Sequence, residues 1–219
     1  MAGGATRQFP SVVPVFAVPG AILLPGGRVP LVVFEPRYLA LIDDALGAGR
    51  MFGLVQPWEG GDGDNGGGPA VGLHAVGTLA RIAAFGETGD GRYLITALGL
   101  SRFRLVDEQD SRLGYRRVAV DYRPFQSDLQ ENTVQLPERD RLLALIRAHL
   151  SGIGLGTELD PLETLKDAEL ADRMAMACPF SPEEKQVLLE APTHLERCRL
   201  MIAMIQRELL AEGGGSTMH

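Results

Sequence analysis

The spacing of apolar and polar positions divides the chain into two halves. Before about Pro124, apolar residues recur at every second position in short runs bounded by glycine, proline and aspartate, a pattern typical of β-strands. The expected strands are 12–18, 71–84, 92–106 with a break at Gly99, and 114–122. After Pro124 the apolar spacing becomes three or four residues, which is typical of amphipathic helices. The expected helices are 137–150, 167–178, 182–189 and a long one that begins near Thr193. Ser181-Pro182-Glu183-Glu184 and Thr193-His194-Leu195-Glu196 are capping boxes, which predict where the last two helices start.

One stretch of the first half changes period within a few residues. The apolar run 29–34 has β-type composition, and it is followed by Glu35-Pro36 and then by a helix-type pattern. Pro36 suits the first helical turn, where its missing N–H costs nothing. A second apolar run, 51–55, follows two glycines. The sequence therefore predicts a strand, a helix and a strand here, with one helical face formed by Tyr38, Leu41, Ile42 and Ala45.

These elements together predict an α+β fold. Short strands joined by hairpins, with one helix inserted, favour a small mixed β-barrel, and the later segments favour a helical bundle. We expect a β-barrel subdomain at residues 9–124 and a helical-bundle subdomain at 125–211. We expect disordered tails at 1–8 and 212–219.

Composition and charge narrow the function. The chain has 219 residues and a net charge of −7, which argues against a general binder of nucleic acids or anionic membranes. No apolar stretch approaches membrane-spanning length, and the first residues lack the apolar core of a signal peptide. Cys178 and Cys198 are too few and too far apart for a zinc site or a disulfide framework, so we expect buried free thiols. These observations predict a cytoplasmic protein.

A glycine-rich segment, 57–69, contains the letters of a dinucleotide-binding motif. Gly61, Gly63 and Gly66 match G-x-G-x-x-G, but more glycines and a proline follow where that motif requires a helix. A calcium loop is also disfavoured, because Leu73 occupies the position of the closing glutamate. We interpret the segment as a flexible linker.

Several short strings resemble one protein family, in the family's order and over nearly the whole chain. The strings are Pro25-Gly26, Pro30-Leu31, Phe34-Glu35-Pro36-Arg37-Tyr38, Phe52-Gly53-Leu54-Val55, Val76-Gly77-Thr78, Asp90-Gly91-Arg92-Tyr93, Gly99-Leu100-Ser101-Arg102-Phe103-Arg104 and Glu184-Lys185-Gln186-Val187-Leu188-Leu189-Glu190. They resemble the Lon N-terminal domain family, the substrate-binding domain of ATP-dependent Lon proteases, which also occurs as free-standing bacterial proteins. The resemblance implies a PUA-like β-barrel followed by a helical bundle, and proteins as binding partners.

The residues that enzyme chemistry would require are missing from the sequence. No G-x-x-x-x-G-K-[ST] loop is present to hold phosphates, so we expect neither ATP hydrolysis nor nucleotide binding. Lys166 and Lys185 are the only lysines, and both lie in charged helical stretches, which is unsuited to a Ser–Lys protease dyad. The four histidines lack metal-ligand spacing. We therefore predict a protein that is not an enzyme and has no cofactor and no metal site.

The candidate partner-binding residues at the start of the inserted helix are Glu35, Arg37 and Tyr38. In one interpretation Tyr38 packs into the core and Arg37 pairs with a carboxylate. In the other, the three residues form a rim where a partner's peptide meets a fixed positive charge. Trp58, the single tryptophan, lies at the start of the glycine-rich segment and either anchors a partner or covers one end of the barrel.

Arginines on the later strands form the remaining candidate surface. Strict alternation places Arg102 and Arg104 on the face opposite Phe103, with Arg117 on an adjacent strand. This face is either a solvated polar surface or a stripe that contacts RNA.

Two functional hypotheses remain from these observations. In the first, the chain is a non-enzymatic module that binds unfolded polypeptide segments and acts as an adaptor in protein quality control. In the second, it binds RNA through its PUA-like barrel. The acidic net charge and the two lysines favour the first hypothesis.

Overall fold

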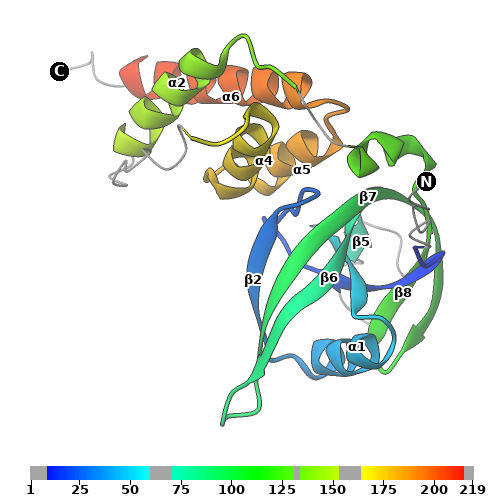
Figure 1. The fold of residues 1–219 in the computed structure, drawn as a ribbon. Helices are drawn as coiled ribbons and strands as arrows, with labels where there is room; N and C mark the ends of the chain where they lie inside the picture. Colours follow the sequence, from blue (N-terminus) through cyan, green and yellow to red (C-terminus); the bar gives the residue numbers. More distant parts are fainter. Residues whose placement is uncertain (1–8, 60–70, 131–133, 153–163, 215–219) are drawn as a thin grey trace. The chain divides into compact units, whose positions relative to one another are not determined.

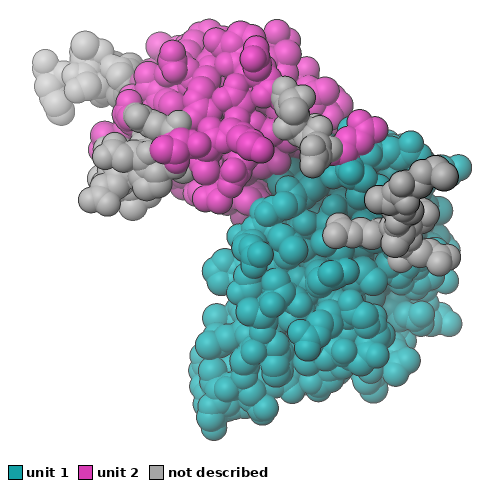
Figure 2. All heavy atoms as spheres, viewed as in Figure 1, with its two compact units in different colours: residues 1–19, 23–129 teal, residues 20–22, 130–219 magenta. Residues whose placement is uncertain are grey.

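The computed structural model describes residues 9–59, 71–130, 134–152 and 164–214. The chain forms two compact units, which Figure 2 colours separately. The first comprises residues 1–19 and 23–129, and the second comprises residues 20–22 and 130–219. Residues 60–69 of the glycine-rich segment, residue 70, and the expected tail residues 1–8 and 215–219 lie outside the described residues. The subdomain boundary between residues 124 and 125 stays a prediction from the change in apolar spacing.

The first unit is a six-stranded, strongly curved sheet with one inserted helix (Figure 1). The strand order is β2-β7-β6-β3-β1-β8, and β8 also pairs with β7, which closes most of the sheet into a ring. Among the strands of this sheet that the structure describes, β1 and β3 run parallel and the other pairs are antiparallel. The strands are β1 (Val12–Ala17), β2 (Arg28–Val33), β3 (Met51–Val55), β6 (Val76–Glu87), β7 (Tyr93–Arg112) and β8 (Tyr115–Asp121).

The inserted helix, α1 (Pro36–Gly47), begins and packs as the sequence pattern predicts. Pro36 occupies the first turn, and the carbonyl of Glu35 accepts the first helical hydrogen bonds, from the N–H groups of Tyr38 and Leu39, each at 2.9 Å. The predicted apolar face is the buried face of the helix. Its members are Tyr38, Leu41, Ile42 and Ala45.

The core of the first unit lies inside the ring of strands. Val13, Val55 and Phe103 are fully or almost fully buried there. Gly77 belongs to one of the family-like strings, and packing explains its presence. A Cβ added to Gly77 would lie 2.6 Å from Val55 Cγ2 and 2.9 Å from Phe103 Cζ, which the close packing of a protein interior does not allow.

The long strand β7 differs from its prediction in one respect. The sequence suggested a break at Gly99, but β7 continues to Arg112 and contains a bulge instead. Leu79 pairs with Ser101 and Ala80 with Gly99, so one extra residue is accommodated between these pairs. A short 3-10 segment, η1 (Arg123–Leu129), follows β8 and contacts β7.

A short hairpin brackets the glycine-rich segment. Strand β4 (Pro57–Glu59) pairs antiparallel with β5 (Val71–Leu73), so the first residues of the expected linker form a strand. Trp58 lies opposite Gly72, and its indole N–H donates to the carbonyl of Leu73 at 3.2 Å.

The second unit consists of helices, as the change in apolar spacing predicts. Within the described part of this unit, the helices are α2 (Arg139–Gly152), α4 (Asp167–Ala177), α5 (Pro182–Glu190) and α6 (His194–Gly214). Helix α6 contacts the other three. It continues to Gly214, three residues into the segment expected to be a tail.

Side-chain capping fixes where two of these helices begin. The Ser181 hydroxyl accepts from the Glu184 N–H and the Glu184 carboxylate accepts from the Ser181 N–H, which completes the capping box predicted for α5. The Thr193 hydroxyl accepts from the Glu196 N–H at the start of α6, as its motif predicts.

A buried ion pair joins three helices of the second unit. Arg197 of α6 donates to Asp172 of α4 at 2.6 Å and to the carbonyl of Leu188 of α5 at 2.9 Å. Both predicted free thiols, Cys178 and Cys198, are buried and unbridged, and burial raises the pKa of each to about 11. None of the described helices is long and apolar enough to cross a membrane.

Candidate functional site

The structure places Glu35, Arg37 and Tyr38 together at the corner between β2 and α1. Tyr38 is buried; its ring stacks on Phe16 at a centroid distance of 4.2 Å, and its hydroxyl donates to the carbonyl of Ala17 at 3.2 Å. Burial raises the pKa of Tyr38, which therefore stays neutral at physiological pH. Tyr38 holds the strand-to-helix junction in place and does not form a contact surface.

Arg37 lies on the outer side of the same corner. Its Nη2 is 2.7 Å from Glu35 Oε2, and its guanidinium lies 4.6 Å from the centre of the Tyr38 ring. The side chains of Arg37 and Glu35 are 51% and 42% exposed, so both remain accessible to a partner. The Arg37 side chain also lies next to Gly114, in the turn between β7 and β8.

The sequence placed Arg102 on an exposed candidate surface, and this prediction is wrong because the side chain is buried. Its side chain is 4% exposed and forms a two-pronged ion pair with Asp128 of η1, the shortest contact being Nη2–Oδ1 at 2.7 Å. Its guanidinium also lies 4.8 Å from the centre of the Phe125 ring. The alternation that placed Arg102 opposite Phe103 was sound, but η1 covers that face of the strand. Arg102 therefore belongs to the scaffold and is removed from the candidate surface.

The other two arginines of the expected stripe lie in different surroundings. Arg104 is exposed on β7, opposite Asp121 of β8. Arg117 of β8 is half-buried and faces Pro14 of β1. Because Arg102 is buried, the three arginines do not form one continuous basic surface.

An apolar surface on β2 and β7 escaped the sequence interpretation. Val32 of β2 lies directly opposite Leu94 of β7, and Phe34 follows two residues after Val32. These three side chains are 53%, 49% and 62% exposed. On the other flank of Leu94 the cross-strand neighbour is Gly86, which has no side chain to cover it. We call this surface, formed by Pro30, Val32, Phe34 and Leu94, the β2–β7 apolar face.

This face lies along an edge of the sheet. Among the described strands, β2 pairs with β7 and with no other, and it is the terminal strand in the sheet order. The Gly99 N–H donates to Gly27, so the antiparallel alternation directs the backbone groups of Arg28, Pro30 and Val32 toward the open edge. Pro30 has no N–H, which weakens that edge as a template for another strand. The side chains of the β2–β7 apolar face, more than its backbone, are therefore what a partner would contact.

Trp58 is the remaining sequence-predicted candidate. It is 42% exposed, and one part of its ring lies against Gly72, where a Cβ would come within 2.4 Å of it. It thus combines a fixed position with an accessible aromatic surface. Its position on β4 separates it in the sheet topology from β2 and β7.

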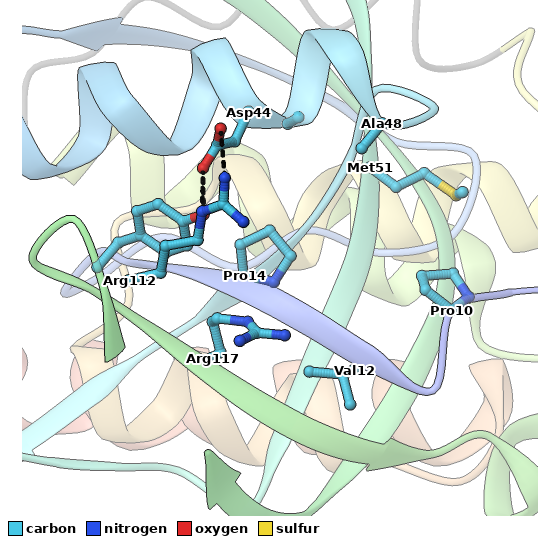
Figure 3. Close-up of a pocket in the computed structure, with 10 residues that line it drawn as sticks. Pro10, Val12, Pro14, Asp44, Ala48, Met51, Arg112 and Arg117 are labelled. Atoms are coloured by element: carbon cyan, nitrogen blue, oxygen red, sulfur yellow. Dashed lines mark hydrogen bonds and ion pairs between the residues drawn. The ribbon is translucent and has the colours of Figure 1, made fainter. Parts of the chain in front are cut away.

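The first unit also contains a pocket, which Figure 3 shows beside the end of α1. Asp44 of α1 accepts a hydrogen bond from the Tyr115 hydroxyl at 2.6 Å and pairs with Arg112 Nε at 2.9 Å. Burial and the hydrogen bond to Asp44 raise the pKa of Tyr115 to about 12. Across the described part of the chain, no three His, Cys, Asp or Glu side chains gather as a metal site would require.

These features, a nearly closed sheet with one inserted helix followed by a set of helices, define the fold class of Lon N-terminal domains. The crystal structure of a Lon N-terminal domain protein from Xanthomonas campestris matches with a TM-score of 0.62 and 27% sequence identity, over 89% of this chain and 98% of that one. The N-terminal domain of a Mycobacterium avium complex Lon protease has the same fold, with a TM-score of 0.63 over the same shares of the two chains. The expected α+β fold class is confirmed.

The chain belongs to the family of the ATP-dependent protease La (LON) substrate-binding domain, whose sequence profile matches residues 12–207. A Lon protease of Anaeromyxobacter dehalogenans is 27% identical over 205 residues, which is 92% of this chain. Lon protease 2 of Sorangium cellulosum is 32% identical over 209 residues, which is 90% of this chain. The chain spans about a quarter of the length of these relatives, 24% and 25% respectively.

Proposed function

We propose that the chain is a non-enzymatic protein-binding module that captures exposed apolar segments of unfolded polypeptides on the β2–β7 apolar face. The observation that carries this proposal is the directly paired, half-exposed Val32 and Leu94, flanked by the still more exposed Phe34. Contiguous exposed apolar side chains of this kind are costly in water and typically mark an interaction surface. The family to which the chain belongs supports proteins as the bound class.

Charge next to the apolar face favours the same class of ligand. Arg37 lies three residues after Phe34 and keeps half of its side chain accessible while paired with Glu35. We propose that Arg37 and Glu35 form the polar rim of the site and contact the backbone or charged residues that flank an apolar segment. Trp58 and Arg104 stand as secondary candidate contacts.

The proposal includes an adaptor role. Bound segments would be passed to a protease whose catalytic residues lie outside these 219 residues, since neither a phosphate-binding loop nor a Ser–Lys dyad is found in the sequence. RNA is the disfavoured ligand, because Arg102 is buried and the arginine stripe is not continuous.

Titration of fluorescein-labelled casein, an unfolded apolar-rich chain, with the purified protein tests the proposal by fluorescence anisotropy. Val32→Ser should weaken binding about tenfold, since burial of a valine side chain contributes roughly 1.5 kcal/mol. The matched control is Val106→Ser, which changes another exposed valine of the same sheet, 64% exposed on β7. The control should bind like the parent protein.

Two further measurements sharpen this test. Leu94→Ser should reproduce the loss caused by Val32→Ser, and a structured RNA of similar length should not compete with casein. In a separate titration with an unlabelled, tryptophan-free unfolded polypeptide, the fluorescence of Trp58, the single tryptophan, reports whether the bound chain reaches that residue. Equal affinity of Val32→Ser, Leu94→Ser and Val106→Ser for casein would refute the proposed face.

A further inference from the structure

The pocket beside α1 is built entirely from the first unit and is distinct from the β2–β7 apolar face. Its volume is about 280 Å³, close to the lower end of the range of ligand pockets. Residues from β1, from the end of α1 and from the β7–β8 hairpin line it (Figure 3). Size alone limits an occupant to a short chemical group or to the last residue of a chain.

The residues that line the pocket include two arginines, Arg112 and Arg117, and one carboxylate, Asp44. Asp44 is already paired with Arg112 and accepts the Tyr115 hydroxyl. Among the described residues, no carboxylate lies within ion-pair distance of Arg117, whose side chain also lines the pocket. Its cross-strand neighbour Gln109 donates its own amide to Asp107. The pocket therefore has one positive charge in excess, and it belongs to a half-buried guanidinium.

One backbone carbonyl at the nearby helix end is already occupied. The carbonyl of Ala45 at the end of α1 accepts from the N–H groups of Ala48 at 3.1 Å and Arg50 at 2.7 Å. The Ala45 carbonyl is thus not free to compete with an anion for the Arg117 guanidinium. A guanidinium with free N–H donors is well suited to a planar carboxylate, which it can bind in bidentate fashion.

The remaining wall is apolar and stiff. Val12 and Pro14 of β1 line it together with Met51 of β3 and Pro10, which precedes β1. Pro14 lies directly opposite Arg117, so the apolar wall begins next to the guanidinium. Proline rings have little conformational entropy to lose on binding, and methionine adapts to irregular shapes. This wall favours a short aliphatic group over a sugar or a nucleobase.

We propose that this pocket binds a carboxylate attached to a short apolar chain, with Arg117 holding the carboxylate and Val12, Pro14 and Met51 contacting the chain. Two sources share this chemistry. One is the free C-terminus of a polypeptide that ends in an aliphatic residue, and this source rests on the proposed function as a protein-binding module. The other is a small aliphatic carboxylic acid, which does not depend on that function.

Calorimetric titration of the full chain with four probes tests the proposal and separates the sources. The probes are N-acetyl-leucine, N-acetyl-leucinamide, a hexapeptide that ends in leucine with a free carboxylate, and the same peptide with a C-terminal amide. At least one free carboxylate should bind about tenfold more tightly than its amide. Preference for the peptide identifies a chain terminus, and equal or better binding of N-acetyl-leucine identifies a small acid. Equal binding of acids and amides, or no binding of either acid, overturns the proposal.

Variants assign the binding to the pocket. Arg117→Met should weaken binding of the tighter-binding acid about tenfold. Arg199→Met, which removes an exposed arginine from α6, should leave that binding unchanged. Ala48→Phe should block the pocket from its exposed rim, and Ala203→Phe on the exposed side of α6 is its matched control. If Arg117→Met does not fold, Arg117→Lys and Ala48→Phe decide the question. Undiminished binding by Ala48→Phe would rule out the pocket.

One more variant separates this proposal from the proposed function. Val32→Ser should weaken casein binding and leave binding of N-acetyl-leucine or the hexapeptide unchanged, because Val32 does not line the pocket. A protein that binds the acid through Arg117 but does not bind casein would refute the proposed function and support the pocket. The reverse result would support the apolar face and refute the pocket.

Discussion

Two corners of the first unit contain the same three chemical groups and use them differently. Each has a guanidinium, a carboxylate and an aromatic ring beneath the guanidinium, at 4.6 Å in one corner and 4.8 Å in the other. The β2–α1 corner consists of Glu35, Arg37 and Tyr38. The β7–η1 corner consists of Asp128, Arg102 and Phe125.

The difference between the corners is burial. In the β7–η1 corner the paired side chains are 4% and 6% exposed, and in the β2–α1 corner they are 51% and 42% exposed. A buried ion pair is expensive to break because one charge is left without a partner or water. An exposed pair loses little, because water replaces the partner. The same three groups therefore stabilise the fold in the β7–η1 corner and remain accessible to a partner in the β2–α1 corner.

A third group, Asp44 with Arg112 and Tyr115, lies between these extremes. Arg112 is 60% exposed, Asp44 is 31% exposed and Tyr115 is buried. Its carboxylate is thus held from one side by a buried phenol and from the other by a solvated guanidinium. The comparison predicts a graded response to substitution across the three groups.

The largest loss of stability is expected where an aromatic ring supports a corner from inside. Tyr38→Ala should lower the free energy of unfolding by about 3–5 kcal/mol, because it removes the ring that stacks on Phe16 and leaves a cavity. Urea denaturation measures the loss. The matched control, Tyr93→Ala, removes a less buried tyrosine that donates to Asp43 at 3.0 Å, and it should cost less. Equal costs for both variants would contradict a supporting role for Tyr38.

Removal of the buried arginine should have a comparable effect. Arg102→Ala should cost about 3–5 kcal/mol, because Asp128 would keep its charge in a buried place without a partner. The exposed neighbour Arg104 gives the control, and Arg104→Ala should change stability by less than about 0.5 kcal/mol. The double variant Arg102→Met/Asp128→Leu should recover most of the loss, since no uncompensated charge remains. Failure of the double variant to recover stability would show that packing under the guanidinium matters more than charge.

The intermediate group predicts a response to alkaline pH. In the folded chain the pKa of Tyr115 is raised from 10.0 to about 12, first by burial and then by the hydrogen bond to Asp44. Because folding favours the neutral phenol, this stabilisation is complete below pH 10 and is lost as the pH rises from 10 to about 12. The stability of the parent protein should fall over that interval, and the stability of Tyr115→Phe should fall less steeply. If the stabilities of the two proteins fell in parallel with rising pH, Tyr115 would not be the cause of the loss.

The smallest effect on stability is expected at the exposed corner. Arg37→Ala should cost less than about 1 kcal/mol, because Glu35 becomes solvated when its partner is removed. Casein binding should nevertheless weaken, if Arg37 belongs to the rim of the proposed site. A severe loss of stability would assign Arg37 to the scaffold, and unchanged casein affinity would remove it from the site.

Local patterns in the sequence determined most of the elements. The change of period after Phe34 predicted α1 and its buried face, because a helix that must cover a core needs apolar residues at helical spacing. The Ser181–Glu184 box predicted where α5 begins, because its hydrogen bonds join residues three apart in the chain. The short strands joined by hairpins, with one helix inserted, also predicted a small mixed barrel.

Only the tertiary structure decided which side chains remain exposed. Arg102 and Arg104 look equivalent in the alternating pattern, but η1, more than twenty residues later, covers Arg102 and leaves Arg104 in water. Val32 and Leu94 look like ordinary strand residues that belong to a core, yet their pairing at an open edge of the sheet leaves both exposed. Arg117 lies opposite Pro14 through the pairing of β8 with β1, and both line the same pocket as Met51 of β3. The alternating pattern shows which residues share a face of a strand. Which of the two faces is covered depends on contacts between residues distant in the chain.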